Sequence, residues 1–454
     1  MTENKNFQMA KRIATFVSEA GGRTFYVGGY VRDKILGKEN KDIDIEIHGI
    51  TPEILEEILD QVGERLEMGA SFGVFGLRGY DLDIAMPRKE EATGRGHKDF
   101  AVFVDPFLGT KKAAMRRDFT MNAMMEDVLT GELVDHFGGV DDIKKGIIRH
   151  VNTKTFVEDP LRVLRAAQFA ARFQFVVAEE TVELSKTMDL NYLACERIYA
   201  ELEKALLKAK KPSIFFEEMR KMNQLTVWFK EVEQLIGVKQ SPEHHPEGDV
   251  WNHTMMVIDE AAKLKDGASN PVGFMFAAIC HDFGKIVTTE EIDGKIHALG
   301  HEIEGLALVK KFLTRITNEV KLRKYVLNMV ELHMRPNIMA AQKSKIKSTN
   351  KMFDLSLDPE GLVLFSIADH MGITGKIRDE KAEAFLNERL AIFHETMEKP
   401  YVMGSDLVKA GLKPSPKFHE ILEYAHKLRL ARVNKDDALR QTLAYARKLE
   451  EGGL

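Results

Sequence analysis

The sequence has little of what defines several large protein classes, beginning with cysteine. Its 454 residues include only two cysteines, Cys195 and Cys280, which lie far apart without a CxxC spacing. This excludes a disulfide-stabilised scaffold and a zinc site built from thiolates. The two residues fit a reducing compartment, so we expect the protein to be cytoplasmic.

Long hydrophobic runs are also absent. The most apolar stretch, PVGFMFAAIC at 271–280, is far too short to cross a bilayer. The N-terminal residues mix charges into their apolar positions, which predicts an amphipathic helix and excludes a signal peptide. We therefore expect no membrane segment.

Neither sign of charge dominates the chain. The 65 basic and 70 acidic residues give a formal charge of −5, so a nucleic-acid site must be a local patch. The clearest basic run is AAQKSKIKSTNKM at 340–352, which is typical of a solvated helix face as well as of such a patch.

The pattern of apolar residues predicts several packed units. Hydrophobic residues make up 44% of the chain, which is ample for burial, and alternating strand-like runs are confined to about 25–139. Helical spacing dominates beyond residue 141, and glycine- or proline-bearing stretches mark the joints. We predict an α/β domain followed by all-α segments, at 1–145, 146–240, 241–395 and 396–454.

The stretch KDIDIEI places two carboxylates on alternate positions. On a strand, Asp42 and Asp44 share one face while Ile43 and Ile45 share the other. Two such carboxylates can hold Mg²⁺, which prefers oxygen ligands and bridges to substrate phosphates. Such pairs are also common at solvated strand ends, so the pair alone does not establish a metal site.

Two neighbouring features complete the parts of a phosphoryl-transfer site. Gly28 and Gly29 lack Cβ atoms, which lets backbone N–H groups approach a triphosphate. The stretch YDLDIAM offers a third carboxylate, Asp83 or Asp81, of which we favour Asp83. Metal-assisted attack of a hydroxyl on a nucleotide is the chemistry that these residue types suit.

The segment EDPLRVLRAAQFAARF predicts a helix with a polar face. Asp159, Arg162 and Arg165 fall on the same side of it. An acceptor beside two donors can read the edge of a base by hydrogen bonding. Taken singly, the same residues are typical of a helix start with local ion pairs.

The ordered set GGxVRD, DxD, RRDFTxNAM and EDPxRxxRAxxFAxRF spans the first 175 residues. It closely resembles the class II tRNA nucleotidyltransferase and bacterial poly(A) polymerase superfamily. The resemblance implies a polymerase-β-like head with helical neck, body and tail, Mg²⁺ as cofactor, and tRNA, CTP and ATP as partners. It implies catalytic and metal-binding roles for Asp42 and Asp44, with Asp83 as the third carboxylate. The nucleotide contacts that it implies are Gly28, Gly29, Arg32, Asp33, Arg116, Arg117, Asp118, Asp159, Arg162 and Arg165.

Within that superfamily, the resemblance implies addition of CCA to the tRNA 3′ end. Asp159 and Arg162 fall where the family uses an Asp and an Arg as a template for CTP and then ATP. The segment between Arg88 and Arg116 occupies the position of the family's flexible loop, which favours full CCA addition. CC-only addition, A-only addition and poly(A) synthesis stay open at this point.

A second ordered set follows in the helical half: HHPEGDVWNH, CHDFGK, GHEIEG, ELHMRP and ADHMG. Imidazoles and carboxylates on successive helices can converge on a metal. The set resembles the HD-domain metal phosphohydrolases and implies a divalent metal, with Lys285 near a phosphate and 2′,3′-cyclic phosphodiesterase or phosphatase activity. The implied ligands are His253, His281, Asp282, His301, His333 and Asp369. The alternative is that this hydrolase is the main activity and the head only binds RNA.

Overall fold

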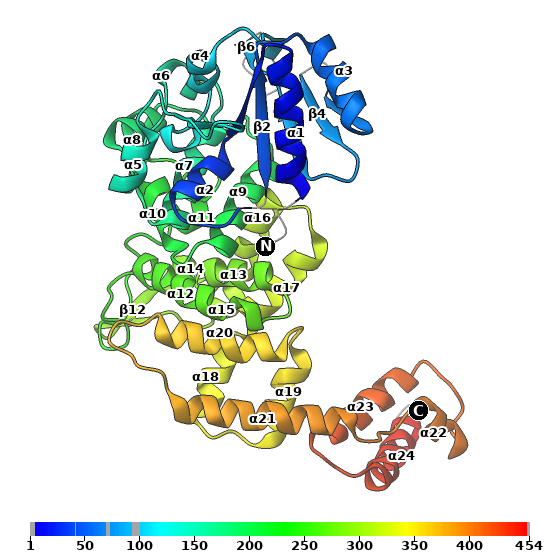
Figure 1. The fold of residues 1–454 in the computed structure, drawn as a ribbon. Coiled ribbons are helices and arrows are strands. Elements are labelled where there is room, and N and C mark those ends of the chain that lie inside the picture. Colours follow the sequence, from blue (N-terminus) through cyan, green and yellow to red (C-terminus); the bar gives the residue numbers. More distant parts are fainter. Residues whose placement is uncertain (1–4, 41, 70–72, 93–99, 452–454) are drawn as a thin grey trace. The chain divides into compact units, whose positions relative to one another are not determined.

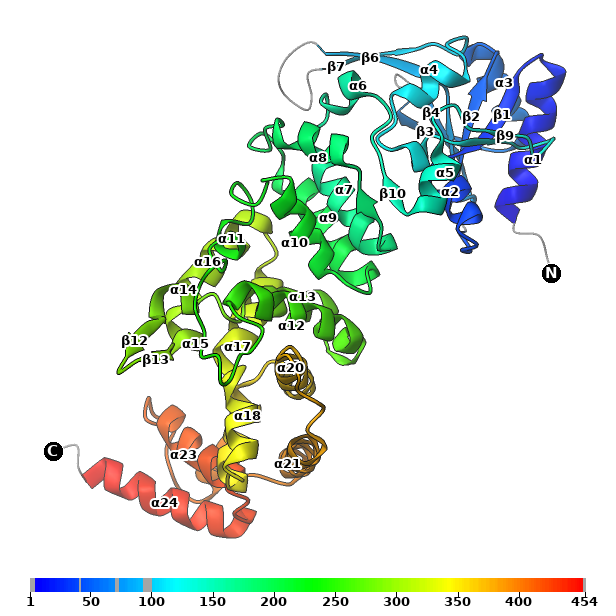
Figure 2. The same cartoon turned by 90° about the vertical axis from the view of Figure 1, so that its left-hand side faces the viewer.

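A computed structural model describes residues 5–40, 42–69, 73–92 and 100–451. The chain divides into two compact units, Met1–Trp228 and Phe229–Leu454. In Figures 1 and 2 the first runs from blue into green and the second from green to red. The predicted fold class, an α/β head followed by helices, is confirmed. The division falls within the predicted segment 146–240, and the four predicted boundaries stay a prediction.

The first unit begins with a seven-stranded sheet in the order β3-β4-β5-β2-β1-β8-β9. Its strands are β1 (Arg23–Val27), β2 (Ile43–His48), β3 (Arg65–Gly69), β4 (Val74–Leu77), β5 (Leu82–Ala85), β8 (Met125–Asp127) and β9 (Leu133–Val134). Its helices are α1 (Lys5–Glu19), α2 (Gly29–Ile35), α3 (Pro52–Val62), α4 (Thr110–Met115), the 3₁₀ turn η2 (Thr120–Asn122) and α5 (Gly139–Lys145). Every strand pair in this sheet is antiparallel except β2 with β5.

Strand β2 has one apolar and one polar face, as its alternating sequence predicts. Ile43, Ile45 and Ile47 are at most 1% exposed. Helix α1 packs against this strand and against α3, and lies across the sheet in Figure 1. Burying one face fixes the register, because a slip of one residue would turn the carboxylates into the core. The opposite face is thereby left for polar side chains.

The predicted flexible loop between Arg88 and Arg116 is ordered at both ends. Strands β6 (Arg88–Ala92) and β7 (Phe100–Val104) pair as an antiparallel hairpin, and α4 follows. Residues 93–99, within the predicted loop, lie outside the described residues.

The rest of the first unit is helical, apart from the short parallel pair β10 (Ile147–Ile148) and β11 (Val176–Val177). Its helices are α6 (Thr153–Phe156), α7 (Leu161–Phe173), α8 (Glu179–Lys186), α9 (Cys195–Lys208) and α10 (Ser213–Lys221). Helix α7 packs on both α9 and α10, and Phe215 and Phe216 are fully buried in this core. The polar face of α7 is therefore turned away from α10 and towards the head.

The second unit is a bundle with one small hairpin, β12 (Glu290–Ile292) and β13 (Lys295–His297). Its first helices are α11 (Lys230–Glu233), α12 (Val250–Leu264), the 3₁₀ turn η3 (Lys265–Gly267), α13 (Pro271–Cys280), α14 (Lys285–Thr288), α15 (His301–Glu304), α16 (Leu306–Ile316) and α17 (Val320–Leu332). They are followed by α18 (Met334–Ala341), α19 (Ile346–Leu355), α20 (Pro359–Met371) and α21 (Glu380–Glu398). Helix α13 is the PVGFMFAAIC run, which is buried from Gly273 to Cys280 and packs on α12 and α17.

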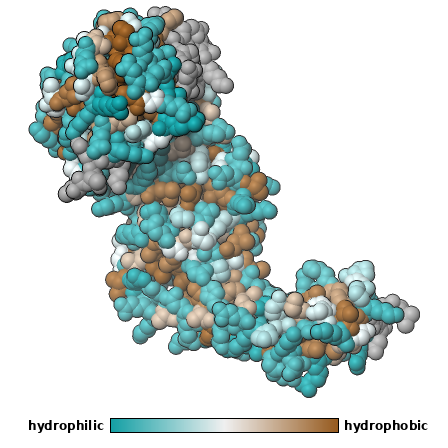
Figure 3. All heavy atoms as spheres, turned by 45° about the vertical axis from the view of Figure 1, so that its right-hand side comes forward, coloured by the Kyte–Doolittle hydropathy of each residue, from teal (hydrophilic) through white to brown (hydrophobic). Residues whose placement is uncertain are grey.

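The unit ends with α22 (Gly404–Lys409), α23 (Phe418–Leu430) and α24 (Lys435–Glu451), which form a core of their own around Leu407 and Ile421. Figure 3 shows hydrophobic and hydrophilic residues interleaved on the face of this module that it presents. No helix in the described ranges is both long and apolar enough to cross a membrane. Both cysteines are free, as expected.

Replacing Ile45 with alanine should destabilise the head by about 3 kcal/mol, because it removes a fully buried side chain beside the carboxylates and leaves a cavity. The measurement is urea-dependent hydrogen exchange of the sheet peptides in the full chain, which isolates this unit's opening. Ile54→Ala is the control, since Ile54 on α3 is 37% exposed. Equal effects of the two substitutions would contradict the assigned core.

Candidate active sites

The predicted head carboxylates meet at the parallel strand pair. Asp44 on β2 and Asp83 on β5 are direct partners in the register, and Asp42 immediately precedes β2 on the same face. All three lie on the polar face of the sheet. The pairing favours Asp83 over Asp81 as the third carboxylate, because Asp83 is the one that faces Asp44.

The carboxylates of this cluster disfavour one another's negative charge, and the pKa values of two of them are raised. Burial, followed by the charges of Asp83 and Asp42, raises the pKa of Asp44 to about 6. The pKa of Asp83 is raised as well, by burial first and then by Asp42. Carboxylates whose charges oppose one another gain most from a shared cation. The donor set, all oxygen, fits a hard divalent ion.

The next residue on the same face, Glu46, was not anticipated from the sequence. It is 1% exposed and accepts hydrogen bonds from Arg117 (Nη2 to Oε2, 3.1 Å) and His48 (Nε2 to Oε1, 2.9 Å), with Arg116 3.7 Å away. Burial opposes its charge, but His48 and Arg117 outweigh burial and lower the pKa of Glu46 to about 2. The sequence feature that could have indicated this residue is the regular spacing of three acidic residues, Asp42, Asp44 and Glu46.

A pocket of about 500 Å³ lies between the sheet and the helices that follow it in the first unit. Eight basic side chains and three aspartates line it. The predicted residues that it brings together are Gly28, Gly29, Arg32, Asp44, Arg117, Asp118, Asp159, Arg162 and Arg165. The lining residues that the sequence reasoning missed include Asn122, Gln168, Arg172, Arg197, Lys204 and Lys208. The polar face of α9, spaced at Arg197, Lys204 and Lys208, could have indicated three of them.

A chain of hydrogen bonds fixes one wall of this pocket. Arg165 on α7 donates to Asp118 at 2.7 Å, Asn122 donates to the same carboxylate at 3.0 Å, and Arg32 donates to Asn122 at 2.8 Å. Burial opposes the charge of Asp118, but Arg165 and Asn122 outweigh it and lower its pKa. The wall is thereby held in one ionised arrangement that joins the head to α7.

Two predicted nucleotide contacts stand behind the pocket. Asp33 is buried and accepts from Arg32 at 2.8 Å and from Asn40 at 2.9 Å. Arg116 contributes its carbonyl oxygen, which accepts from Arg162 at 2.7 Å. In this structure both residues hold neighbouring side chains in place and do not line the cavity.

The side chains predicted to read the base, Asp159 and Arg162, are engaged in other hydrogen bonds. Arg162 donates to the carbonyl oxygens of Thr155 and Arg116, and Asp159 accepts from Arg197 at 2.9 Å. Gly28 lies beside the cluster with φ of +67°, which favours glycine, and an added Cβ would come 3.7 Å from Asp44. The pocket thus brings Asp44, a candidate metal ligand, together with side chains that donate hydrogen bonds and side chains that accept them.

The second predicted site assembles in the second unit. Its six residues come from the ends and middles of separate helices: α12, α13, α15, the junction of α17 and α18, and α20. Three groups of described side chains could each hold an ion, and two of them consist of predicted ligands: His253 with His281 and Asp369, and Asp282 with His301 and His333. All six predicted ligands are therefore brought together.

The histidine rings are oriented for metal binding. The ring N–H at Nδ1 donates to the carbonyl oxygen of Ala278 in His281 (3.0 Å), of Ala298 in His301 (2.9 Å) and of Val330 in His333 (2.6 Å). Each Nε2 is then left as an acceptor. Yet Nε2 of His301 and of His333 lie 3.3 Å apart. Two acceptors at that distance repel unless a cation or proton lies between them.

Two further observations on the histidine rings of this centre also fit a bound cation. Nε2 of His281 is buried, and no hydrogen-bond partner for it is found among the described residues. Burial, with the charge of His281, lowers the pKa of His333 to about 4, so this ring is neutral at pH 7, as a ligand must be. The donor set of imidazole and carboxylate fits a divalent transition metal.

One residue of the HHPEGDVWNH stretch, Glu247, supports His253 from behind. Glu247, whose side chain is 2% exposed, lies 3.0 Å from Nδ1 of His253 and 2.8 Å from Nδ1 of His245. This carboxylate was not predicted, although its place in the motif was the available signal. Lys285, expected near a phosphate, contacts Asp282 at 2.8 Å and donates to Gln240 at 2.7 Å. Its phosphate role stays a prediction.

Comparisons with known proteins agree with both sites. The model of the poly(A) polymerase head domain matches residues 24–149, and that of the HD domain matches residues 250–372. A multifunctional CCA protein of Actinobacillus pleuropneumoniae serotype 5b is 34% identical over 369 residues, covering 79% of this chain and 87% of that protein. The chain belongs to the multifunctional CCA protein family. It is thus a nucleotidyltransferase with an HD domain, as the sequence motifs predicted.

One further relative supports the assignment to this family, and one solved structure shows the same fold. The multifunctional CCA protein of Laribacter hongkongensis is 39% identical over 315 residues, which is 68% of this chain and 74% of that protein. The fold matches that of a Thermotoga maritima CCA-adding enzyme solved with tRNA, with a TM-score of 0.64, 22% identity, and coverage of 98% and 96% of the two chains. The residue roles within this family fold stay predictions.

Replacing Glu46 with glutamine should destabilise the head by about 3 kcal/mol, because Arg117 would lose a buried carboxylate partner while keeping its charge. Urea-dependent hydrogen exchange of strand β2 measures this. Glu132→Gln is the control, since Glu132 forms an exposed ion pair with Arg23. If Glu46→Gln behaved like the control, Glu46 would not be holding Arg117.

Replacing Gly284 with alanine should weaken metal binding at the HD centre by at least roughly ten-fold, because the new Cβ would meet the carbonyl oxygen of the ligand His301. Metal titration of the chelator-treated chain measures this. Gly404→Ala is the control, since its Cβ would only touch Leu422 at 4.0 Å. An unchanged affinity in Gly284→Ala would show that His301 is not needed for the ion.

Proposed function

We propose that the protein adds C, C and A to the 3′ end of tRNA from CTP and ATP, without a nucleic-acid template. The observation that carries this proposal is the single pocket that joins Asp44 to Asp159 and Arg162. In the reaction, the oxygen of the tRNA 3′-hydroxyl bonds to the α-phosphorus and the hydroxyl gives up its proton. The bond from that phosphorus to the bridging oxygen breaks, and pyrophosphate leaves.

We assign roles to the side chains by their positions. Mg²⁺ held by Asp42, Asp44 and Asp83 would lower the pKa of the attacking hydroxyl and neutralise the leaving group. Arg32 and Arg117 face the same cavity and offset the triphosphate charge. Asp159 and Arg162 present the acceptor and the donors that read the base. These substrates, together with the two free cysteines, support a cytoplasmic location.

For the HD centre we propose hydrolysis of phosphate esters, including 2′,3′-cyclic phosphates. The convergence of the Nε2 atoms of His301 and His333 at 3.3 Å, with each Nδ1 bonded outward, supports it. A divalent metal at this centre would activate water and polarise the phosphoryl oxygens. Glu247 orients the ring of His253 through Nδ1, and Lys285 holds the carboxylate of Asp282.

The test is extension of tRNA transcripts that end at the discriminator base, at C or at CC, with Mg²⁺ and CTP, ATP or both, resolved to single nucleotides. We expect CCA followed by a stop. Addition of CC only, A only or a long A tail would replace the proposal by that activity. No addition, with hydrolysis of a cyclic phosphate intact, would make the head an RNA-binding module.

Two variants should separate the chemistries. Asp44→Asn should lower nucleotide addition by roughly 10³-fold or more because a metal ligand is lost, while hydrolysis continues. His281→Asn should lower hydrolysis by a similar factor, while nucleotide addition continues. Both rates are measured on the same preparations, with circular dichroism to confirm folding. Loss of both activities in either folded variant would refute the two-site assignment.

A further inference from the structure

A pocket of about 620 Å³ adjoins the HD centre within the second unit. It lies between α18, α20 and α21, which pack on one another and stand side by side in Figure 2. The ligand Asp369 is part of its wall. The Asp369 side chain is 16% exposed, whereas those of His253 and His281 are 1% exposed. The metal centre therefore opens into this pocket at Asp369.

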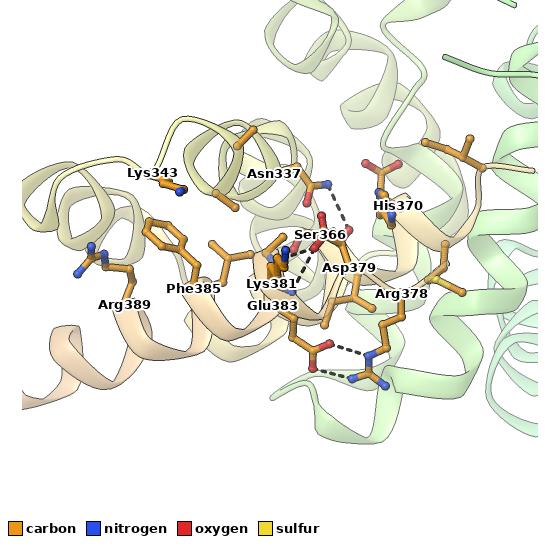
Figure 4. Close-up of a pocket in the computed structure, with 18 residues that line it drawn as sticks. Asn337, Lys343, Ser366, His370, Arg378, Asp379, Lys381, Glu383, Phe385 and Arg389 are labelled. Atoms are coloured by element: carbon orange, nitrogen blue, oxygen red, sulfur yellow. Dashed lines mark hydrogen bonds and ion pairs between the residues drawn. The ribbon is translucent and has the colours of Figure 1, made fainter. Parts of the chain in front are cut away.

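Much of the pocket wall is apolar. The lining side chains of this kind are Ala340, Ile367, Met371, Ile373, Phe385 and Leu386. In Figure 4 the ring of Phe385 stands between Lys343 and Arg389 at one end of the pocket. An apolar cavity with an aromatic ring and a few charged groups is the usual setting for a nucleoside.

The same end of the pocket carries two basic side chains, Arg389 and Lys343. Nε of Arg389 is buried and has no hydrogen-bond partner in the described part of the chain, and its guanidinium stacks 4.8 Å from the Phe385 ring. Nη1 of the same guanidinium pairs with Glu388 at 3.4 Å. Among the described residues, no acidic group pairs with the ammonium of Lys343 or of Lys381.

The acidic side chains Glu383 and Asp379 of the pocket already have hydrogen-bond partners. Glu383 takes both donors of Arg378, each at 2.6 Å, as the dashed lines in Figure 4 mark. Asp379 caps α21 by accepting from the backbone of Lys381 and Ala382. Arg389 and Lys343 are thus left as a basic pair beside Phe385, whereas Lys381 lies further along the pocket, next to Ser366 and Glu383.

We propose that this pocket holds the last nucleoside of an RNA 3′ end, with Arg389 and Lys343 binding the phosphodiester on its 5′ side. The inference rests on the proposed hydrolase function and names its substrate class. The terminal phosphate then lies at the metal centre, the base and ribose lie against Phe385, and the next phosphate meets Arg389 and Lys343. A mononucleotide or a small synthetic ester can fill only part of this arrangement.

The reaction on such an end is hydrolysis of a terminal 2′,3′-cyclic phosphate. The oxygen of water bonds to phosphorus, and one of the two ring P–O bonds breaks. The departing ribose oxygen takes a proton from the water and becomes a hydroxyl group. The other ester bond stays, so the product is a terminal phosphomonoester. Arg389 and Lys343 take no part in the bond changes and only position the RNA.

Hydrogen exchange of the full chain tests binding without any turnover. The probe is the dinucleotide CpA carrying a 3′-phosphate, added with Mg²⁺ and in parallel with Mn²⁺. We expect protection of peptides covering 366–389 in the wild type and in Lys399→Gln, a matched lysine change at the residue that follows α21 and lies outside the pocket. Protection should be lost in Arg389→Gln and in Lys343→Gln. Absent protection in the wild type, or equal protection in all four proteins, would overturn the proposal.

Hydrolysis then tests the role of the 5′ phosphodiester. The two substrates are CpA with a 2′,3′-cyclic phosphate and 2′,3′-cyclic AMP, which has the same base and lacks a 5′ phosphate. Arg389→Gln should lower the ratio of kcat/KM for the first over the second by about ten-fold, mainly through KM. An unchanged ratio would overturn the proposal. Failure of the wild type on both substrates, with protection intact, would refute the hydrolase function and leave the pocket assignment standing.

Discussion

Mutual repulsion among ligand groups is the constraint on which both sites depend. Asp44 and Asp83 face each other across a parallel strand pair, and Nε2 of His301 faces Nε2 of His333. Neither arrangement is favourable without a cation or a proton, so each must be imposed by the surrounding fold. In the head the imposing element is the buried isoleucine face of β2. In the HD domain it is the set of backbone carbonyls that accept from Nδ1.

The groups behind the ligands show how the fold balances this cost. Glu46 stands one step further along β2 than Asp44 and gathers Arg117, His48 and Arg116. It therefore places positive charge beside the acidic cluster and ties the strand to the motif that follows α4. In the second unit, the carboxylate of Glu247 likewise contacts and orients two imidazoles, those of His245 and His253. Neither residue needs to touch a substrate to determine the geometry of the site.

The sequence predicted the ligands more completely than their supports, for a physical reason. Asp42, Asp44 and the six HD residues are polar groups at positions that packing does not explain, so their pattern stands out. Glu46 and Asn122 act through partners that are distant in sequence, Arg117 and Arg32, and only the fold shows those pairs. Asp33 and Arg116 were predicted as nucleotide contacts from their motifs, yet in this structure they hold Arg32 and Arg162. Periodicity cannot tell a residue that lines a pocket from one directly behind it.

The distribution of basic residues explains how an acidic chain can handle polyanions. The net charge is −5, yet eight basic side chains converge on the head pocket, and Arg389 and Lys343 lie beside Phe385 in the second unit. In both places most acidic neighbours are engaged, as Asp118 is by Arg165 and Glu383 by Arg378. What matters for binding phosphate is the charge left over after local pairing, and the total composition does not report it. Each pocket therefore combines a candidate metal ligand, Asp44 or Asp369, with a separate set of basic side chains. This combination suits substrates that carry more than one phosphate.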